Sequence, residues 1–129
     1  MEFPEDLKYS KEHEWVLVEG DVATIGITDY AQHQLGDIVF VELPAVGDKA
    51  TKDEAFSVVE SVKAVSDVYA PVSGKVLEVN RKLEDNPALI NKDCYGKGWI
   101  AKIDVRDMDE STNLMSADEY RSYLETLAH

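Results

Sequence analysis

The chain has 129 residues, which is enough for one domain with its own hydrophobic core, and 44% of these residues are hydrophobic. Its 13 basic and 26 acidic residues give a formal net charge of −13, which argues against binding nucleic acid or an anionic membrane, because both need basic patches. The single cysteine, Cys94, excludes an internal disulfide framework, and no apolar run is long enough to span a bilayer.

The N-terminus and the charge indicate the compartment and the oligomeric state. Residues 1–6 are acidic and carry no signal or transit pattern, and a single cysteine fits a reducing compartment. We therefore expect a cytoplasmic protein of bacterial type, or a mitochondrial-matrix protein whose leader has been removed. The strong negative charge and the lack of an exposed apolar run predict a monomer.

The N-terminal third predicts a hairpin, a short helix and a further strand. Residues 13–18 and 22–27 are rich in Val, Ile and aromatic residues, which favours two strands joined by a turn. Thr28 is a suitable N-cap for a short helix that ends before Gly36. Residues 38–43 predict the next strand.

The middle of the chain predicts a second hairpin with a lysine at its exposed tip. After a polar loop at residues 44–54, residues 55–59 and 68–72 predict two strands, which residues 60–67 connect. Lys63 would project into water from this connection, and its amine is a common target for acylation, which removes its charge. A lysine in a turn is usually a plain solvated residue, so this position alone indicates no function.

The segment after this hairpin predicts two strands separated by an irregular stretch. Residues 75–79 and 99–103 have the composition of strands. Residues 80–98 between them are polar and contain Pro87, so they predict mainly loop, anchored to the core by residues 88–90.

The C-terminal segment predicts an amphipathic helix. Ser116 and Glu119 form a capping box, in which each side chain satisfies a free backbone N–H of the other residue. A weaker helical turn is expected at residues 109–115. Several short strands with helices at the periphery indicate a β-sandwich or a flattened barrel. The apolar stripe of the helix, which we expect to pack against the sheet, consists of Tyr120, Tyr123, Leu124 and Leu127.

The residues that could catalyse a reaction or bind a metal form no recognised motif. Cys94 would need a base or a positive field to act as a nucleophile, and His13, His33 and His129 lie in no catalytic pattern. Because Cys94 falls in a predicted polar loop, we interpret it as incidental. The sequence has no metal-ligand spacing, which predicts no metal site, and no glycine-rich nucleotide fingerprint. Such a chain suits a carrier whose chemistry is performed by partners.

Motifs along the whole chain closely resemble those of glycine cleavage H proteins, the lipoyl carriers of the glycine cleavage system. The segment around Lys63, E-S-V-K-A-V-S-D-V-Y-A-P-V-S-G-K-V, resembles their lipoyl-attachment segment. One such motif would not be specific, whereas an ordered set of them is. The other matches are K-Y-S-K-E-H-E-W at residues 8–15, G-I-T-D-Y-A-Q at 26–32, L-G-D-I-V-F-V-E-L-P at 35–44 and G-W-I-A-K-I at 98–103.

The resemblance implies a fold and a domain organisation. The fold would be mainly β, the flattened barrel-sandwich hybrid of lipoyl and biotinyl domains, with short peripheral helices and a C-terminal helix. Residues 1–129 would form a single lipoyl-carrier domain. Its core would cover about residues 14–105, and a C-terminal helical segment would cover about residues 108–128.

The resemblance also implies a non-catalytic carrier with lipoic acid in amide linkage on Lys63. Such a carrier takes the aminomethyl group of glycine from the decarboxylase (P protein) to the aminomethyltransferase (T protein). Dihydrolipoamide dehydrogenase (L protein) reoxidises it, and a lipoate ligase or lipoyl transferase attaches the lipoyl group. The alternative is a lipoyl-relay or H-like protein that is not engaged in glycine turnover.

The residues beside Lys63 distinguish lipoate from other attached groups. Biotin carriers typically have methionine on both sides of the lysine, whereas this chain has Val62 and Ala64. The lipoyl domains of 2-oxoacid dehydrogenases have an acidic residue directly before the lysine, whereas here Glu60 lies three places before it. Both of these classes are therefore disfavoured.

The resemblance further implies that the loaded arm shelters in a cleft of the carrier, because water can strip an aminomethyl group. A cationic amine favours nearby carboxylates and an apolar lining. Motif position indicates Glu14 and Asp67 as the carboxylates, and Ile27 with the helix after Thr28 as the lining. The alternative for Glu14 and Asp67 is two solvated carboxylates at strand ends.

Overall fold

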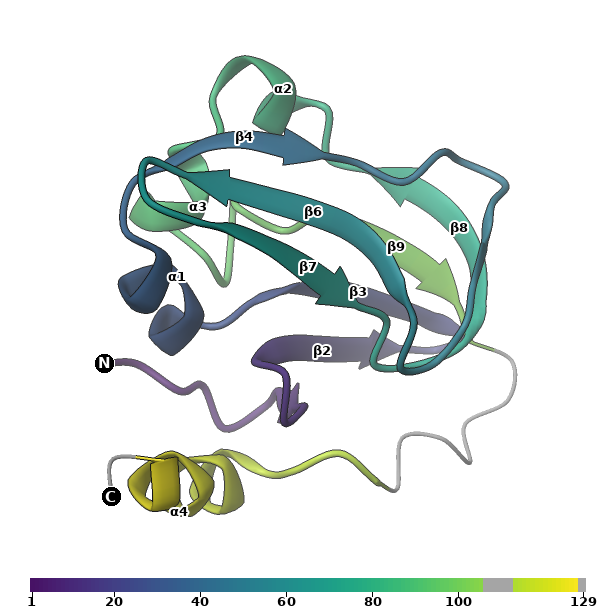
Figure 1. The fold of residues 1–129 in the computed structure, drawn as a ribbon. Coiled ribbons are helices and arrows are strands. Elements are labelled where there is room, and N and C mark those ends of the chain that lie inside the picture. The colour runs from purple at the N-terminus through teal and green to yellow at the C-terminus, as the bar shows by residue number, and fades with distance from the viewer. Residues whose placement is uncertain (106–112, 128–129) are drawn as a thin grey trace.

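Two antiparallel sheets face each other in the computed structural model, which describes residues 1–105 and 113–127 (Figure 1). The larger sheet has six strands in the order β1-β2-β3-β9-β8-β5, and the smaller has three in the order β4-β6-β7. Neither sheet closes on itself, so the predicted sandwich class is confirmed. The strands are β1 (Lys8–Tyr9), β2 (Glu14–Glu19), β3 (Val22–Ile27), β4 (Ile38–Glu42), β5 (Lys49–Ala50), β6 (Ala55–Ser61), β7 (Val65–Tyr69), β8 (Gly74–Val79) and β9 (Ala101–Asp104). The helices are α1 (Asp29–Leu35), α2 (Lys82–Asp85), α3 (Leu89–Lys92) and α4 (Ala117–Leu127).

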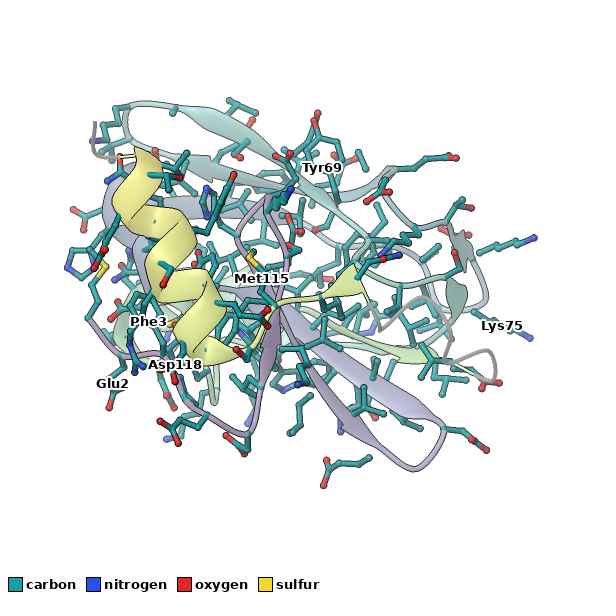
Figure 2. The ribbon with its side chains drawn as sticks, turned by 90° about the horizontal axis from the view of Figure 1, so that it is seen from below. Glu2, Phe3, Tyr69, Lys75, Met115 and Asp118 are labelled. Atoms are coloured by element: carbon teal, nitrogen blue, oxygen red, sulfur yellow. The ribbon has the colours of Figure 1, made fainter. Side chains whose placement is uncertain are left out.

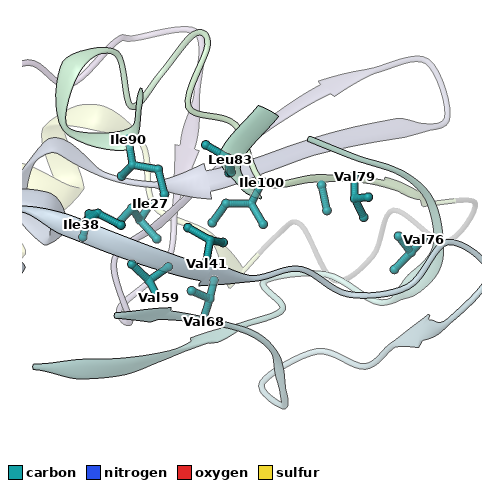
Figure 3. Packing of buried hydrophobic residues seen from close by; sticks show 11 residues of the cluster. Ile27, Ile38, Val41, Val59, Val68, Val76, Val79, Leu83, Ile90 and Ile100 are labelled. Atoms are coloured by element: carbon teal, nitrogen blue, oxygen red, sulfur yellow. The ribbon is translucent and has the colours of Figure 1, made fainter. Parts of the chain in front are cut away.

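The main hydrophobic core lies between the two sheets (Figure 3). Val59 of β6 and Val68 of β7 pack in one cluster with Ile27 of β3. Residues alternate along β6, so that Ser57, Val59 and Ser61 are buried while the residues between them keep some exposure. Burying one valine or isoleucine side chain contributes roughly 1.5–3 kcal/mol. This core fixes the smaller sheet, and the hairpin that carries Lys63, on the larger sheet.

The helix α1 begins and ends where the sequence predicts. Thr28 is the N-cap, and its Oγ1 accepts a hydrogen bond of 3.2 Å from the backbone N–H of Ala31. Gly36 ends the helix with φ of 82°, a backbone region that favours glycine, and its N–H donates to the carbonyl of Gln32. The helix α1 lies at the same end of the sandwich as the turn between β6 and β7 (Figure 1).

The helix α4 and the N-terminal segment lie against the larger sheet, on the side away from the smaller sheet (Figures 1 and 2). Tyr9 and Met115 exchange backbone hydrogen bonds of 2.8 and 2.7 Å, which tie the two segments together. The Trp15 ring lies so close to Gly26 that a Cβ there would be 2.6 Å from Nε1, so the strand β3 needs glycine at this point. We call the buried side chains between α4 and the sheet the aromatic layer: Leu7, Tyr9, Trp15, Ala117 and Tyr120.

The predicted capping box of the C-terminal helix is confirmed, and three of the four residues of its predicted apolar stripe pack as expected. The backbone N–H of Glu119 donates to Ser116 Oγ at 3.2 Å, and that of Ser116 donates to Glu119 Oε1 at 2.9 Å. Tyr120 is buried in the aromatic layer, with Tyr123 and Leu124 packed against it, while Leu127 is exposed. The stripe therefore covers the protein's own sheet.

The strand after Lys63 begins earlier than predicted. The ladder between β6 and β7 pairs Glu60 with Val65 and Val59 with Ser66, so the prediction of a strand at residues 68–72 was wrong by three positions at its start. The connection shortens to residues 62–64 because cross-strand pairing continues almost to the tip. The lysine thus stands on a stiffer support than the sequence indicated.

Residues 80–98 are mainly loop as predicted, but they also contain the short helices α2 and α3, which the sequence did not predict. These helices bury Leu83 and Ile90 completely, and residues 88–90 are an anchor as predicted. The predicted polar loop at residues 44–54 contains the short strand β5, which pairs with β8. Residues 109–112 of the weaker predicted turn lie outside the described residues.

The predicted division of residues 1–129 into a core and a C-terminal helical segment stays a prediction. Across residues 1–105 and 113–127, no helix has the length and apolar character needed to cross a bilayer.

Candidate functional site

The turn between β6 and β7 is held by the side chain of Ser61. The backbone N–H groups of Lys63 and Ala64 donate to Ser61 Oγ at 3.3 and 3.0 Å, and the Ser61 N–H donates to the Ala64 carbonyl at 2.8 Å. The N–H of Val62 donates to the carbonyl of Asp37 at 3.1 Å, which fastens the turn to the segment after α1. The backbone of the turn is therefore fixed, while the Lys63 side chain is exposed.

The Lys63 side chain lies alongside the end of α1. A Cβ placed on Gly36 would be 3.6 Å from Lys63 Cε, an ordinary van der Waals distance, so the lysine side chain passes beside this residue. Leu35, the residue before Gly36, lines a pocket that opens between α1, β7 and the start of β2. Lys63 does not itself line this pocket but lies beside the residue that follows Leu35.

The pocket has a volume of about 230 Å³ and brings together the three residues predicted for the cleft, Glu14, Ile27 and Asp67. Its floor is largely apolar and its edge carries carboxylates, a combination that suits a cationic group on an apolar chain. A larger open groove of about 620 Å³, formed by residues of β4, β5 and β6, contains none of the predicted site residues. The residues that line the smaller pocket, which we call the arm pocket, are Glu12, His13, Glu14, Ile27, Tyr30, Ala31, Gln34, Leu35, Val59, Ser66, Asp67 and Val68.

Glu14 is the buried acid of the arm pocket, and it also lines a second pocket together with Ser10 and Tyr69. Only 2% of its surface is exposed, so it is not the solvated carboxylate of the alternative interpretation. Ser10 Oγ donates to its Oε1 at 2.5 Å, and the N–H of Tyr69 donates to its Oε2 at 3.3 Å. Burial raises the pKa of Glu14 from 4.5 to about 7, although both hydrogen bonds act in the opposite direction. A cation in the arm pocket would favour its ionised form.

Asp67 and Ile27 occupy different parts of the arm pocket. Asp67 is exposed on β7, so the prediction of a solvated carboxylate describes it well, although it lines the pocket. Ile27 is buried at the end of β3 and belongs to the main core. The pocket therefore has one buried carboxylate and exposed carboxylates at its edge.

His13 is a pocket residue that the sequence did not identify. Its φ of 73° is unusual for a residue other than glycine, and its ring centroid lies 4.8 Å from that of Tyr30. Its Nδ1 lies 2.8 Å from the hydroxyl of Tyr120 on α4. Burial lowers the pKa of His13, which favours the neutral ring. No local pattern could reveal this contact, because the two residues are 107 positions apart.

Cys94 lies in the loop after α3, as the sequence predicted, but its side chain is buried. Burial raises the pKa of its thiol to about 12, so the nucleophilic thiolate is disfavoured at neutral pH. Within residues 1–105 and 113–127, no group of three or more His, Cys, Asp or Glu side chains could hold a metal ion.

Exposed apolar side chains surround the lysine. Val65 and Phe40 both pair with Glu60 across the smaller sheet and therefore share its outer face. The monomer was predicted partly from the lack of an exposed apolar run; the structure brings exposed apolar side chains from two segments together, and the monomer stays a prediction. We call this group the apolar surface around the turn: Val39, Phe40, Val62 and Val65, which are 52%, 51%, 70% and 67% exposed.

Comparison with known proteins gives a consistent set of similar sequences and structures. The model of the family described as glycine cleavage H-protein matches residues 7–127. A glycine cleavage system H protein of Halothermothrix orenii is 57% identical over 125 residues, which cover 97% of this chain and 98% of that protein. One of Halalkalibacterium halodurans is 59% identical over 121 residues, which cover 94% of each. The crystal structure of a glycine cleavage system H protein from Mycobacterium marinum is similar with a TM-score of 0.87 and 40% identity, over 95% of this chain and 99% of that one.

Proposed function

This chain belongs to the glycine cleavage H-protein family, and on that premise we propose that Lys63 carries lipoic acid in amide linkage and that the arm pocket shelters the loaded arm. The chain has the role of its family, a carrier in glycine cleavage. When bound, the lipoyl group supplies the sulfur atoms that take up the aminomethyl group of glycine. The single observation that supports the proposal is the position of Lys63, exposed on a fixed turn beside a pocket with a buried acid.

The residues at the turn fit an attached acyl group. Within the described part of the chain, the Lys63 ammonium makes no hydrogen bond or ion pair, so forming an amide there removes no contact. Acylation removes the positive charge and leaves a flexible neutral chain. Because Lys63 Cε lies beside Gly36, which follows the lining residue Leu35, an acyl extension of this side chain would need only a short path to the arm pocket.

The arm pocket fits an amine cargo. Its lining contains three carboxylates, those of Glu12, Glu14 and Asp67, and neither Lys nor Arg. Ile27 and Val68 exclude water from the floor. Glu14 would ionise as an ammonium group approaches, because a nearby positive charge lowers the pKa that burial has raised. The arm pocket should therefore hold a lipoyl arm that carries the cationic aminomethyl group more strongly than a neutral arm without it.

The partners that we propose are those of the family: the P, T and L proteins, and a lipoate ligase or lipoyl transferase. The apolar surface around the turn supports docking there, since such exposed patches often mark protein interfaces. The net charge of −13 favours partners with basic surfaces. We also propose that the chain catalyses no reaction by itself, which the raised pKa of the Cys94 thiol supports. The alternative, a lipoyl-relay protein without glycine turnover, is not favoured, because the similar proteins are named for glycine cleavage.

Intact-mass measurement tests the attachment site. After co-expression with a lipoate ligase, the protein should gain the mass of one lipoyl group, and Lys63→Arg should abolish this gain. Lys75→Arg is the matched control, because Lys75 is exposed on β8 and lies outside the proposed site. A mass gain that persists in Lys63→Arg would place the attachment elsewhere.

Glycine turnover tests the carrier role. The lipoylated protein should release no CO2 from glycine alone and should support turnover once the P, T and L proteins are added. Turnover of glycine by this protein without partners would contradict a pure carrier.

A further inference from the structure

The helix α4 reaches the arm pocket through the hydroxyl of Tyr120. This side chain is fully buried, and its hydroxyl lies 2.8 Å from His13 Nδ1 and 2.8 Å from Thr28 Oγ1. His13 lines the arm pocket directly. Thr28 is the N-cap of α1, the helix that provides Tyr30 and Leu35 to the lining. One hydroxyl therefore contacts both the segment before β2 and the start of α1, two chain segments that contribute to the pocket lining.

The Tyr120 ring is held firmly in the aromatic layer. It stacks on Tyr9 with ring centroids 4.8 Å apart and planes 4° apart, and it meets Phe3 edge-on at 5.4 Å. Such aromatic contacts fix a ring in position. The position of the hydroxyl is thus set by packing on the outer side of the larger sheet.

The hydrogen bonds around this hydroxyl form a consistent chain. Thr28 Oγ1 accepts from the N–H of Ala31 at 3.2 Å. The Tyr120 hydroxyl lies 2.8 Å from Thr28 Oγ1 and 2.8 Å from His13 Nδ1, and one assignment satisfies both distances: Thr28 donates to Tyr120, and Tyr120 donates to Nδ1 of a neutral His13. Burial raises the pKa of Tyr120, which keeps the hydroxyl protonated. This arrangement satisfies both hydroxyls and Nδ1 of the imidazole.

The backbone of His13 depends on neighbouring contacts. Its φ of 73° is a costly conformation for a histidine, which persists only where surrounding contacts determine it. The N–H of His13 donates to the Ser10 carbonyl, and its carbonyl accepts from the N–H of Thr28, both at 3.1 Å. The Tyr120 hydroxyl adds the side-chain contact that fixes the ring.

We propose that Tyr120 is a positioning residue of the arm pocket, which holds His13 and the N-terminus of α1 in place through its hydroxyl. The proposal rests on the sheltering role proposed above for the arm pocket. Removing the hydroxyl leaves the ring packing intact but frees the imidazole and loosens the N-cap of α1. The loss of one such hydrogen bond changes the equilibrium between the held and the released His13 ring about fivefold.

The test compares Tyr120→Phe with the matched control Tyr123→Phe. Tyr123 lies on the same helix, but its hydroxyl contacts the carbonyl of Lys11 at 3.4 Å and neither Thr28 nor His13. The first readout is the 15N NMR spectrum of the His13 ring in the unlipoylated protein, where only Tyr120→Phe should change the protonation of Nδ1. The second is the rate at which the loaded, lipoylated protein loses its aminomethyl group, which Tyr120→Phe should raise about fivefold.

A second pair of variants separates positioning from a general loss of structure. Thr28→Ser keeps a hydroxyl at the N-cap and should retain the wild-type loss rate, whereas Thr28→Val should raise it as Tyr120→Phe does. Unchanged His13 signals and an unchanged loss rate in Tyr120→Phe would overturn the positioning role. If Glu14→Ala still raised the rate in that case, the sheltering role would stand. If neither variant raised it, both proposals would fail.

Discussion

The turn that carries Lys63 and the arm pocket are neighbours, yet they are built in different ways. The turn is held by hydrogen bonds within residues 61–64 and by one bond to Asp37, and its lysine is exposed. The arm pocket is assembled from β2, β3, α1, β6 and β7, and its acid, Glu14, is 2% exposed. An attachment point needs reach and access, which a short local segment provides. A shelter needs exclusion of water, which requires distant segments to pack together.

The largest expected difference concerns the pH dependence of stability. The folded-state pKa of Glu14 is raised from 4.5 to about 7, so the folded protein binds this proton more tightly than the unfolded chain does. The free energy of unfolding should therefore fall as the pH rises from about 4.5 to about 7, by roughly 3 kcal/mol. Urea unfolding of wild type and Glu14→Gln at several pH values measures this, and the variant should lack the fall.

A matched variant at the turn tests whether the pH dependence of the free energy of unfolding comes from the arm pocket. Lys63→Gln changes an exposed side chain and should alter stability by less than about 0.5 kcal/mol. His13 has a lowered pKa and contributes with the opposite sign, but it does so equally in wild type and Glu14→Gln. Parallel curves for wild type and Glu14→Gln would contradict the assigned pKa of Glu14.

The second prediction concerns the rate at which the loaded protein loses its aminomethyl group. Glu14→Ala should raise the rate of aminomethyl loss at least tenfold, because a charged hydrogen-bonding partner contributes about 1.5–3 kcal/mol. Lipoylation of Lys63 should be unaffected, because the turn does not include Glu14. Glu12→Ala is the control: it removes an exposed carboxylate from the same lining and should have a smaller effect. A loss rate equal to that of wild type would remove Glu14 from the shelter.

The turn should respond locally to substitution. Ser61→Ala removes the acceptor of the Lys63 and Ala64 N–H groups and should lower the free energy of unfolding by about 1 kcal/mol. Amide hydrogen exchange should accelerate at these two positions and remain unchanged at Glu14. Faster exchange throughout the arm pocket would show that the turn and the pocket are one structural unit.

The contrast between local and distant contacts also explains what the sequence could predict. The exposed turn at Lys63, the N-cap at Thr28 and the helix end at Gly36 were predicted correctly because such features depend on a few adjacent residues. Glu14 and Asp67 were identified only through resemblance, and periodicity could not tell that one is buried and the other exposed.

The pocket contact between His13 and Tyr120 was missed because it joins residues 107 positions apart. At residues 80–98 the prediction of mainly loop holds, but it missed the short helices α2 and α3, which bury two apolar side chains within a polar stretch. Tertiary packing, which local pattern does not contain, decided both cases.

The smallest expected effect is that of Asp67→Asn, which probes the edge of the arm pocket. Asp67 is exposed, so water and salt screen its attraction for a cationic cargo, and such exposed pairs contribute about 1 kcal/mol or less. The variant should raise the rate of aminomethyl loss by less than about fivefold, and 0.5 M salt should remove most of the difference from wild type. An effect as large as that of Glu14→Ala, and insensitive to salt, would mean that the bound arm covers Asp67 and buries it. In that case Asp67 would shelter the bound arm together with Glu14, and the region from which the arm excludes water would extend along β7 toward Lys63.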